Sequence, residues 1–241
     1  MKNIKTALWV RKAHRYLGIF LGLQFLLWTL SGMYFSWTDL DEIHGDHFKR
    51  EIIQQKSFVD LPGTGRLALE HPVRSLELLD IGGTPHYWID EEVLYNARTG
   101  EKRSGISRQE AVQVASRHMR PDLEVAEVKM IREVDAHHEY RGKPLPAYEI
   151  RYDTPDNLKV YVAASNGAFQ TVRHRSWRWF DFLWMTHTMD YNTRDDFNTT
   201  LLRIFSLLGL VTVLSGFILW YISSPTIRGW RRKKSKAVSI L

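Results

Sequence analysis

Histidine is the residue type in this chain with the widest chemical repertoire, and one of its ten histidines stands in an unusual setting. His187 lies in the stretch Trp184-Met-Thr-His-Thr-Met-Asp-Tyr191, shortly before the second of two long apolar runs. If residues 176–191 form a helix, His187 shares one stripe with four aromatic residues, namely Trp177, Phe180, Trp184 and Tyr191. An imidazole on such a face can ligate the iron of a flat, apolar partner such as a porphyrin. The alternative is an interfacial helix whose histidine only forms hydrogen bonds.

His14 is the second histidine in a setting that suits a ligand. It precedes Gly18 by one helical turn, and Gly18 and Gly22 form a G-x-x-x-G pair. Small residues at this spacing allow another helix or a flat cofactor to approach the backbone closely. The alternative is that His14 belongs, with its basic neighbours, to a cytoplasmic membrane anchor.

His44 and His47 follow the first apolar run, in a segment rich in carboxylates. At the spacing i, i+3 they would share one helical face, where they could bind a transition metal. A solvated helix next to the membrane is the alternative. Both lie just outside the first apolar run, at the depth expected for His187, so either one is a candidate to pair with His187 across a haem.

The remaining histidines are less suited to act as ligands. His137 and His138 are adjacent, so their side chains diverge, and we assign them to a loop tip. His71, His86, His118 and His174 are scattered and are interpreted as surface or core residues. The chain has no cysteine, which excludes disulfides, iron–sulfur clusters and covalent haem attachment. A haem would therefore be held by histidine, with Met185 and Met189 as secondary candidates.

Two apolar runs organise the chain. Residues 16–38 and 204–227 are free of charged side chains over 23 and 24 residues, and each is long enough to cross a hydrocarbon core of about 30 Å as a helix. The first run is too long for the apolar region of a cleaved signal peptide and lacks a small-residue cleavage pattern. The sequence therefore predicts a membrane protein with two spans.

The net charge of +6 is concentrated at the two ends of the chain. Residues 1–15 carry five Lys and Arg residues and residues 225–241 carry six, without a single acidic residue in either segment. The segment between them is therefore net acidic. By the positive-inside rule, both ends are predicted to be cytoplasmic and the central segment periplasmic. The basic composition thus indicates topology at a bacterial inner membrane and lipid contact, and not nucleic-acid binding.

The central segment has the pattern of a soluble α+β domain. Strands are expected at 76–79, 87–89, 93–95, 125–132, 147–152, 159–163 and 168–172. Ser107 with Glu110 forms a capping box at the start of a helix that Pro121 limits. The chain is divided into a basic tail (1–15), a transmembrane helix (16–38), an α+β domain (39–175), an interfacial aromatic helix and link (176–200), a transmembrane helix (201–224) and a basic tail (225–241).

These motifs together resemble the PepSY-associated transmembrane protein family. The resemblance rests on Trp9-x-Arg-x-x-His14 with Gly18 and Gly22, on Ser31-Gly32 before the acidic exit, on the Ser107 helix with its antiparallel strands, and on His187 before a span containing Ser215-Gly216. It implies a PepSY fold from residue 106 to about 172, a helix packed on an antiparallel sheet. Some members are inner-membrane ferric-siderophore reductases that hold b-type haem through histidines, which implies a ligand role for His14 and His187.

The distance between the two histidines limits how a haem can be bound. A straight span of 23 residues separates the membrane surfaces by about 35 Å, so His14 and His187 are not expected to ligate the same iron. Related reductases usually have about four spans, whereas this chain has two. We therefore expect a homodimer in which His14 pairs with its own copy, and His187 pairs with His44, with His47 or with its own copy.

Two functions of different classes are compatible with the sequence. The first is an electron-transfer component that reduces the iron of a periplasmic ferric chelate. The second is a membrane-anchored PepSY module that inhibits or scaffolds another envelope protein, in which the histidines are structural. A transporter is a weaker third alternative, because the spans contain no charged residue for a substrate path.

Overall fold

The computed structural model describes residues 2–51, 57–67, 69 and 71–225, and it divides the chain into two compact units. One unit contains residues 1–37 and 183–241, and the other contains residues 38–182. The predicted basic tail at 225–241 lies almost entirely outside the described residues. Each unit is described separately below.

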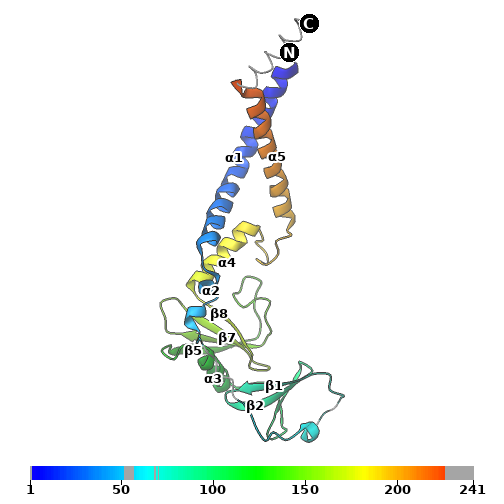
Figure 1. Cartoon of the computed structure of the whole chain (residues 1–241), viewed down its shortest axis with the longest axis vertical. Coiled ribbons are helices and arrows are strands. Elements are labelled where there is room, and N and C mark those ends of the chain that lie inside the picture. The colour runs from blue at the N-terminus through cyan, green and yellow to red at the C-terminus, as the bar shows by residue number, and fades with distance from the viewer. Residues whose placement is uncertain (1, 52–56, 68, 70, 226–241) are drawn as a thin grey trace. The chain divides into compact units, whose positions relative to one another are not determined.

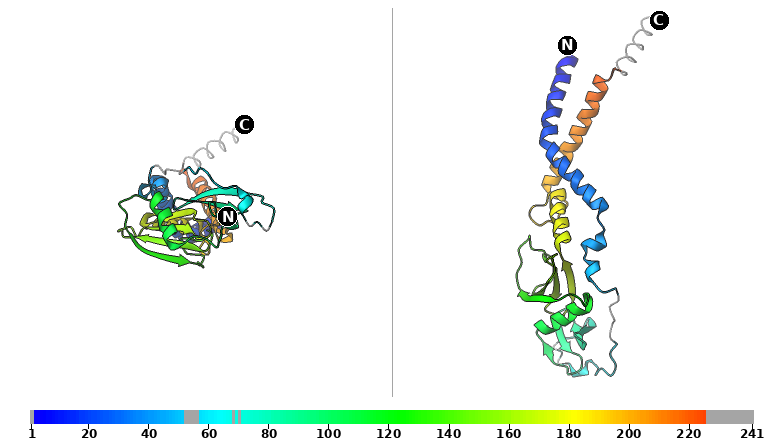
Figure 2. Two further views of the ribbon diagram at one scale, coloured as in Figure 1. Left: turned by 90° about the horizontal axis from the view of Figure 1, so that it is seen from below. Right: turned by 90° about the vertical axis from the view of Figure 1, so that its left-hand side faces the viewer.

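The first unit contains two long antiparallel helices, α1 (Lys2–Trp37) and α5 (Thr200–Ser223), which contact each other over part of their lengths and diverge elsewhere (Figure 1). Figure 2 shows the same pair from a second side. The stretches Leu8–Trp37 and Thr200–Ser223 are long and apolar enough to cross a membrane. The helix α1 also extends through the segment predicted as a basic tail. The side chains that point away from the helix pair are mostly large and apolar, as expected for helices surrounded by lipid.

The second unit contains two antiparallel sheets of four strands each. The first sheet has the order β1-β2-β3-β4, with strands β1 (Leu76–Ile81), β2 (Thr84–Ile89), β3 (Val93–Asn96) and β4 (Lys102–Arg103). The second has the order β5-β6-β7-β8, with strands β5 (Val125–Ile131), β6 (Ala147–Tyr152), β7 (Lys159–Ala163) and β8 (Phe169–Arg173). All connections are between sequence neighbours, so both sheets are simple meanders.

The helix α3 (Arg108–His118) contacts both sheets and joins them into one core (Figure 1). Its apolar residues Ala111, Val114 and Ala115 are buried among residues of β6 and β7, and Ile81 and Leu94 of the first sheet belong to the same cluster. The first sheet is therefore not an independent domain. Short helical turns complete the unit, namely α2 (Leu40–Ile43), η1 (Asp46–Phe48) and η2 (Thr64–Arg66).

The fold class predicted from the sequence is confirmed: two apolar helices flank an α+β region in which a helix packs on antiparallel sheets. The predicted capping box is also present, because the Glu110 backbone N–H donates to Ser107 Oγ and the Ser107 backbone N–H donates to the Glu110 carboxylate. The local sequence was sufficient to predict this helix start, because the capping box and the helix are formed by neighbouring residues.

Glu110 also gives this unit a predictable response to acid. Arg103 donates two hydrogen bonds to the Glu110 carboxylate, of 2.6 and 2.7 Å, and with the Ser107 bonds they lower the pKa of Glu110 from 4.5 to about 2. A carboxyl with a lowered pKa stabilises the folded state above its unfolded pKa, and this contribution is lost as pH falls from about 4.5 towards about 2.

We expect the contribution of Glu110 to be about 1–2 kcal/mol, because solvent screens part of this ion pair. The Glu110→Gln variant should be less stable at pH 6 and should lose less stability on acidification than the wild type. Thermal unfolding of the full chain in detergent, followed by circular dichroism between pH 6 and pH 3, measures this difference. Identical pH dependence in the two proteins would contradict the assignment.

Candidate functional site

The C-terminal end of helix α4 (Arg175–Thr188) carries His187 and packs against α1. A helix leaves its last carbonyl groups without partners inside the helix, which is costly in an apolar environment. Two polar side chains of α1 provide these partners. The amide of Gln24 donates to the carbonyl of Thr186 (3.2 Å), and the indole of Trp28 donates to the carbonyl of His187 (2.7 Å). The backbone at His187 is therefore fixed against the span.

The ring of His187 lies against one turn of α1. Its Nδ1 is 2.7 Å from Ser31 Oγ, and a Cβ built on Gly32 would lie 3.9 Å from its Cε1. Phe35 covers the ring edge-on, with the two ring centroids 5.5 Å apart. Burial lowers the pKa of His187, which favours the neutral imidazole that can ligate a metal.

Asp190 holds the chain immediately after His187. Its carboxylate accepts hydrogen bonds from the backbone N–H groups of Asn192 (3.2 Å), Thr193 (3.1 Å) and Asp196 (2.9 Å), and from the Thr193 hydroxyl. Burial alone would raise the pKa of Asp190, but these donors outweigh it and hold the pKa well below its usual value. Asp190 is only 3 % exposed. It therefore stays charged and shapes the link that leads to α5.

His14 occupies a similar position between α1 and α5. Its Nδ1 is 2.7 Å from Ser215 Oγ, and a Cβ built on Gly216 would lie 3.4 Å from its Cε1. Gly216 also lines an open apolar groove of about 430 Å³ on α5, together with Val213, Phe217 and Trp220. The ring of His14 thus lies against Ser215 and Gly216, and Gly216 also belongs to the lining of the groove.

The two histidines form separate sites with the same local arrangement. Each ring contacts a serine through Nδ1 and lies over the glycine that follows this serine in the sequence. An α-helix rises about 1.5 Å per residue, so the interval from His14 to Ser31 along α1 corresponds to about 25 Å. This separation is shorter than the one expected from the sequence, because His187 lies at the level of Ser31 and not at the end of α1. A separation of about 25 Å still prevents His14 and His187 from ligating the same iron.

His44 and His47 do not lie on one helix. The helix α2 ends at Ile43, and Gly45 between the two histidines has a φ of +74°, in the left-handed region. The alternative in which they bind a metal from one helical face is therefore wrong. His47 instead packs beside the ring of His174, with centroids 5.4 Å apart, and His44 is exposed.

The expected aromatic stripe is also shorter than the sequence indicated. The helix α4 ends at Thr188, and Met189 has a φ of +55°. Tyr191 therefore lies outside the helix. The physical reason is the set of hydrogen bonds to Asp190, which stabilises a loop in place of a further helical turn. Trp184 remains next to the site, 5.8 Å from Phe35 between ring centroids.

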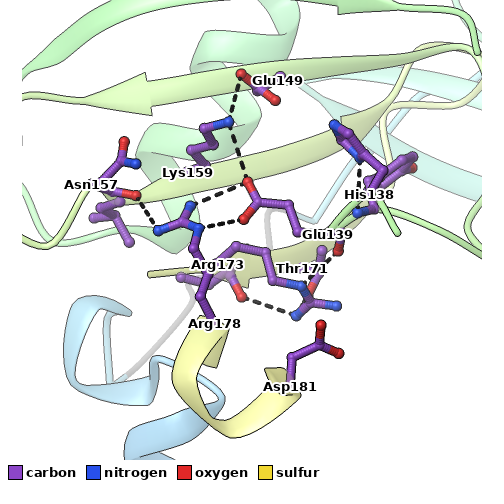
Figure 3. Close-up of polar contacts among 12 residues, drawn as sticks. His138, Glu139, Glu149, Asn157, Lys159, Thr171, Arg173, Arg178 and Asp181 are labelled. Carbon is purple, nitrogen blue, oxygen red and sulfur yellow. Dashed lines mark hydrogen bonds and ion pairs between the residues drawn. The ribbon is translucent and has the colours of Figure 1, made fainter. Parts of the chain in front are cut away.

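The other end of α4 is fastened to the second sheet by a cluster of charged residues (Figure 3). Arg178 donates to Glu139 (2.7 Å), and Lys159 of β7 lies 3.3 Å from Glu139 and 3.2 Å from Glu149. Burial tends to raise the pKa of Glu139, but Arg178 outweighs it and the pKa is lowered. Breaking a buried ion pair by removing one partner typically costs about 3–5 kcal/mol. We therefore assign this cluster a structural role.

The remaining histidines match their predicted roles where the structure describes their surroundings. His86 and His174 are buried, and His118 stacks on Phe169 with centroids 4.4 Å apart. Within the described ranges, no group of three or more His, Asp or Glu residues is arranged to hold a metal ion. His14 and His187 of the first unit, which contains the two long helices, therefore remain the principal candidates for a functional site.

Sequence reasoning missed the side chains that hold these histidines. Gln24, Trp28 and Asp190 had not been recognised as functional, although Gln24 is a rare polar residue inside the first apolar run. In the sequence the two Ser-Gly pairs contribute to the family resemblance, but nothing there identifies them as partners of the histidines. A lone polar residue within a membrane span can indicate a contact with another segment. An unpaired polar side chain is costly in lipid, so it needs a hydrogen-bond partner.

Comparison with known families gives one match of almost the full chain. The family described as PepSY-associated TM region matches residues 11–239. This range includes His14 and His187, most of α1, all of α5 and the two sheets of the second unit. Comparisons with curated proteins and with solved structures give no significant match.

Proposed function

We propose that this chain, which belongs to the PepSY-associated transmembrane family, binds b-type haem through His14 and His187 and acts in electron transfer at the membrane. The observation that carries the proposal is the arrangement of these two side chains. One ring nitrogen of each contacts a serine, and the other has no hydrogen-bond partner among the described residues. An imidazole held in this way is a suitable axial ligand for haem iron.

The surroundings of both residues fit a flat, apolar group. Glycine lies beneath each ring, so no side chain fills the space where Gly32 and Gly216 approach it. The groove of about 430 Å³ beside Gly216 has an almost wholly apolar lining. Bound haem would supply one-electron oxidation and reduction. The residues of the chain would provide the ligand atom, its orientation and an environment that excludes water.

Each site requires a second ligand, and this requirement favours a homodimer. A second copy of the chain would bring a second His14 to the inner site. For the outer site, the partner of His187 would be the His187 of that second copy. The face of α1 that carries Gly18 and Gly22 is open, because nothing described lies within 4 Å of a Cβ built on either glycine. Small residues on an open face favour close helix packing in membranes.

The Gly18→Leu variant tests the homodimer. Leucine should not disturb the chain itself, because no described atom lies within 4 Å of the new Cβ. It should block a second copy, so we expect the dimer to dissociate and the haem content to fall by about half or more. Size-exclusion chromatography with light scattering measures the first effect and absorbance the second. Ile19→Leu, on the exposed neighbouring residue, is the control. A dimer that persists in Gly18→Leu would contradict this interface.

The proposed substrate is the iron of a ferric chelate on the periplasmic side. Support comes from the resemblance to ferric-siderophore reductases and from the charge pattern, in which basic residues at both ends favour cytoplasmic termini. The protein would then lie in the bacterial inner membrane, with residues 39–175 in the periplasm. Lipid surrounds the two helices, and no nucleic-acid partner is proposed.

A second candidate function is a binding module without redox activity. The observation that favours it is the edge strand β1, which exposes Leu76 (41 %) and Leu78 (44 %). An exposed apolar edge can pair with a strand of another protein. In this case the histidines would only connect helices, and the purified protein would be colourless.

An optical spectrum distinguishes the two functions. The protein is expressed with ample haem supply, purified in detergent and reduced with dithionite. We expect a Soret band that shifts on reduction, and its absence from the double variant His14→Ala/His187→Ala. The variant His71→Ala, on an exposed histidine of the second unit, should retain the full band. An unchanged band in the double variant would overturn the assignment of the ligands.

A further inference from the structure

We infer that Ser31 and Ser215 are positioning residues that hold the proton of His187 and of His14 on Nδ1, so that Nε2 is the ligand atom at both sites. The inference deepens the proposed function and rests on it for the role of Nε2. The assignment of the tautomer rests on hydrogen bonds within the helical unit and does not require haem.

The hydrogen bonds of Ser31 determine the direction of its contact with His187. Its hydroxyl lies 2.6 Å from the carbonyl oxygen of Leu27 and 3.2 Å from that of Trp28. A hydroxyl has one proton to donate, and a carbonyl oxygen at 2.6 Å can only be an acceptor. The Ser31 proton is therefore directed to the backbone, and Oγ accepts the bond of 2.7 Å from His187 Nδ1–H.

The opposite tautomer would leave this serine with an unfavourable contact. If Nε2 carried the proton, Nδ1 would be an acceptor and the Ser31 hydroxyl would have to turn towards it. The oxygen atoms of Ser31 and Leu27 would then face each other at 2.6 Å without a proton between them. Ser31 is only 1 % exposed, so water is not positioned to relieve the contact.

Ser215 repeats this arrangement at the second site. Its hydroxyl donates to the carbonyl of Thr212 (2.7 Å), so its oxygen accepts from His14 Nδ1–H at 2.7 Å. At both sites the serine bonds back to its own helix, the histidine comes from another helix, and the following glycine leaves room for the ring. Two independent positions in the sequence thus use the same three residue types in the same roles.

This arrangement has two consequences for a metal ligand. The hydrogen bond fixes the rotation of the imidazole, and it makes the unprotonated nitrogen more basic. Loss of such a partner typically lowers metal affinity by about 10- to 100-fold. Serine is a neutral acceptor, so we expect an effect near 10-fold. A less basic ligand also stabilises ferric iron less, so the midpoint potential of the affected haem should rise.

The tautomer can be measured in the full-length protein without haem. Histidine labelled with ¹⁵N and ¹³C is incorporated, and the ring nitrogen shifts of His14 and His187 are recorded in detergent micelles at pH 8. We expect protonated Nδ1 and unprotonated Nε2 at both residues. Assignment is made with His14→Gln and His187→Gln, each of which removes one signal set. Protonated Nε2 at either residue would overturn the inference for that site.

The haem-loaded protein provides the second test. Transfer of haem to apomyoglobin should be about 10-fold faster in Ser31→Ala and in Ser215→Ala, each at its own site, with a raised midpoint potential. Ser31→Thr retains a hydroxyl and should restore the wild-type rate. The control is Ser36→Ala, because Ser36 bonds back to the carbonyl of Met33 on the same helix and is exposed.

The NMR and haem-transfer experiments have different outcomes if the role of the serines is wrong and if haem binding is wrong. Haem rates and potentials that are unchanged in the alanine variants would overturn the positioning role. A wild-type protein that shows protonated Nδ1 but binds no haem would overturn the proposed function, while the tautomer would stand. A loss of haem that Ser31→Thr does not restore would indicate a packing effect and would also overturn the role of the hydroxyl.

Discussion

Replacing His187 by alanine is expected to remove about half of the bound haem from the purified protein, because the outer site loses its ligand while the inner site is unaffected. The fold should survive. Gln24 and Trp28 bind backbone carbonyls of Thr186 and His187, and these carbonyls remain in the variant. The measurement is the Soret absorbance per chain, with the reduced-minus-oxidised difference spectrum.

The cavity left by the His187 ring allows a sharper version of this experiment. Free imidazole added to His187→Ala should occupy the space beside Ser31 and Gly32 and restore part of the missing band. Imidazole should have no such effect on the wild-type protein. Full haem content in His187→Ala without imidazole would show that the residue is not a ligand, and would favour the second candidate, a binding module.

Replacing His14 by alanine is expected to remove the other half of the haem. The two sites are about 25 Å apart along α1, and substitutions at this distance usually act independently. The losses in the two single variants should therefore add, and the double variant should be colourless. Among the described residues, Ser215 is the only hydrogen-bond partner of the His14 side chain, so the loss of this side chain should weaken the contact between α1 and α5 only slightly.

The matched control for His14→Ala is Arg15→Ala. Arg15 neighbours His14 in α1 and is exposed, so its removal changes the charge of this end of the helix without touching the site. Haem content should be unchanged in this control. A complete loss of haem in either single histidine variant, with the fold retained, would contradict this prediction. It would show that His14 and His187 do not form two separate haem sites.

Local patterns in the sequence were sufficient for most of the fold. The capping box of Ser107 and Glu110, the two apolar helices and every strand except the two-residue β4 (Lys102–Arg103) were predicted, because they depend on residues close together in the chain. The end of α4 was not predicted, because the hydrogen bonds of Asp190 compete with continuation of the helix through Tyr191. Such a competition between a loop and a helical turn is not visible in the apolar periodicity.

The candidate site could be predicted only in part, for a physical reason. His14 and His187 were recognised from their neighbours in the sequence. Their serine partners are 201 and 156 residues away, and this pairing depends on which faces of the helices pack together. Two Ser-Gly pairs, one in each apolar run, were the available signal. Only the folded structure shows that each pair lies against a histidine ring.

A pyridine haemochrome assay on the purified wild-type protein, after expression with ample haem, tests directly whether the chain binds haem. We expect the spectrum of non-covalently bound b-type haem, because the chain has no cysteine for covalent attachment. The haem should be extractable with acidic acetone and should be present at about one per chain, as two shared sites in a homodimer require. A colourless protein that is folded and dimeric would show that the chain does not bind haem.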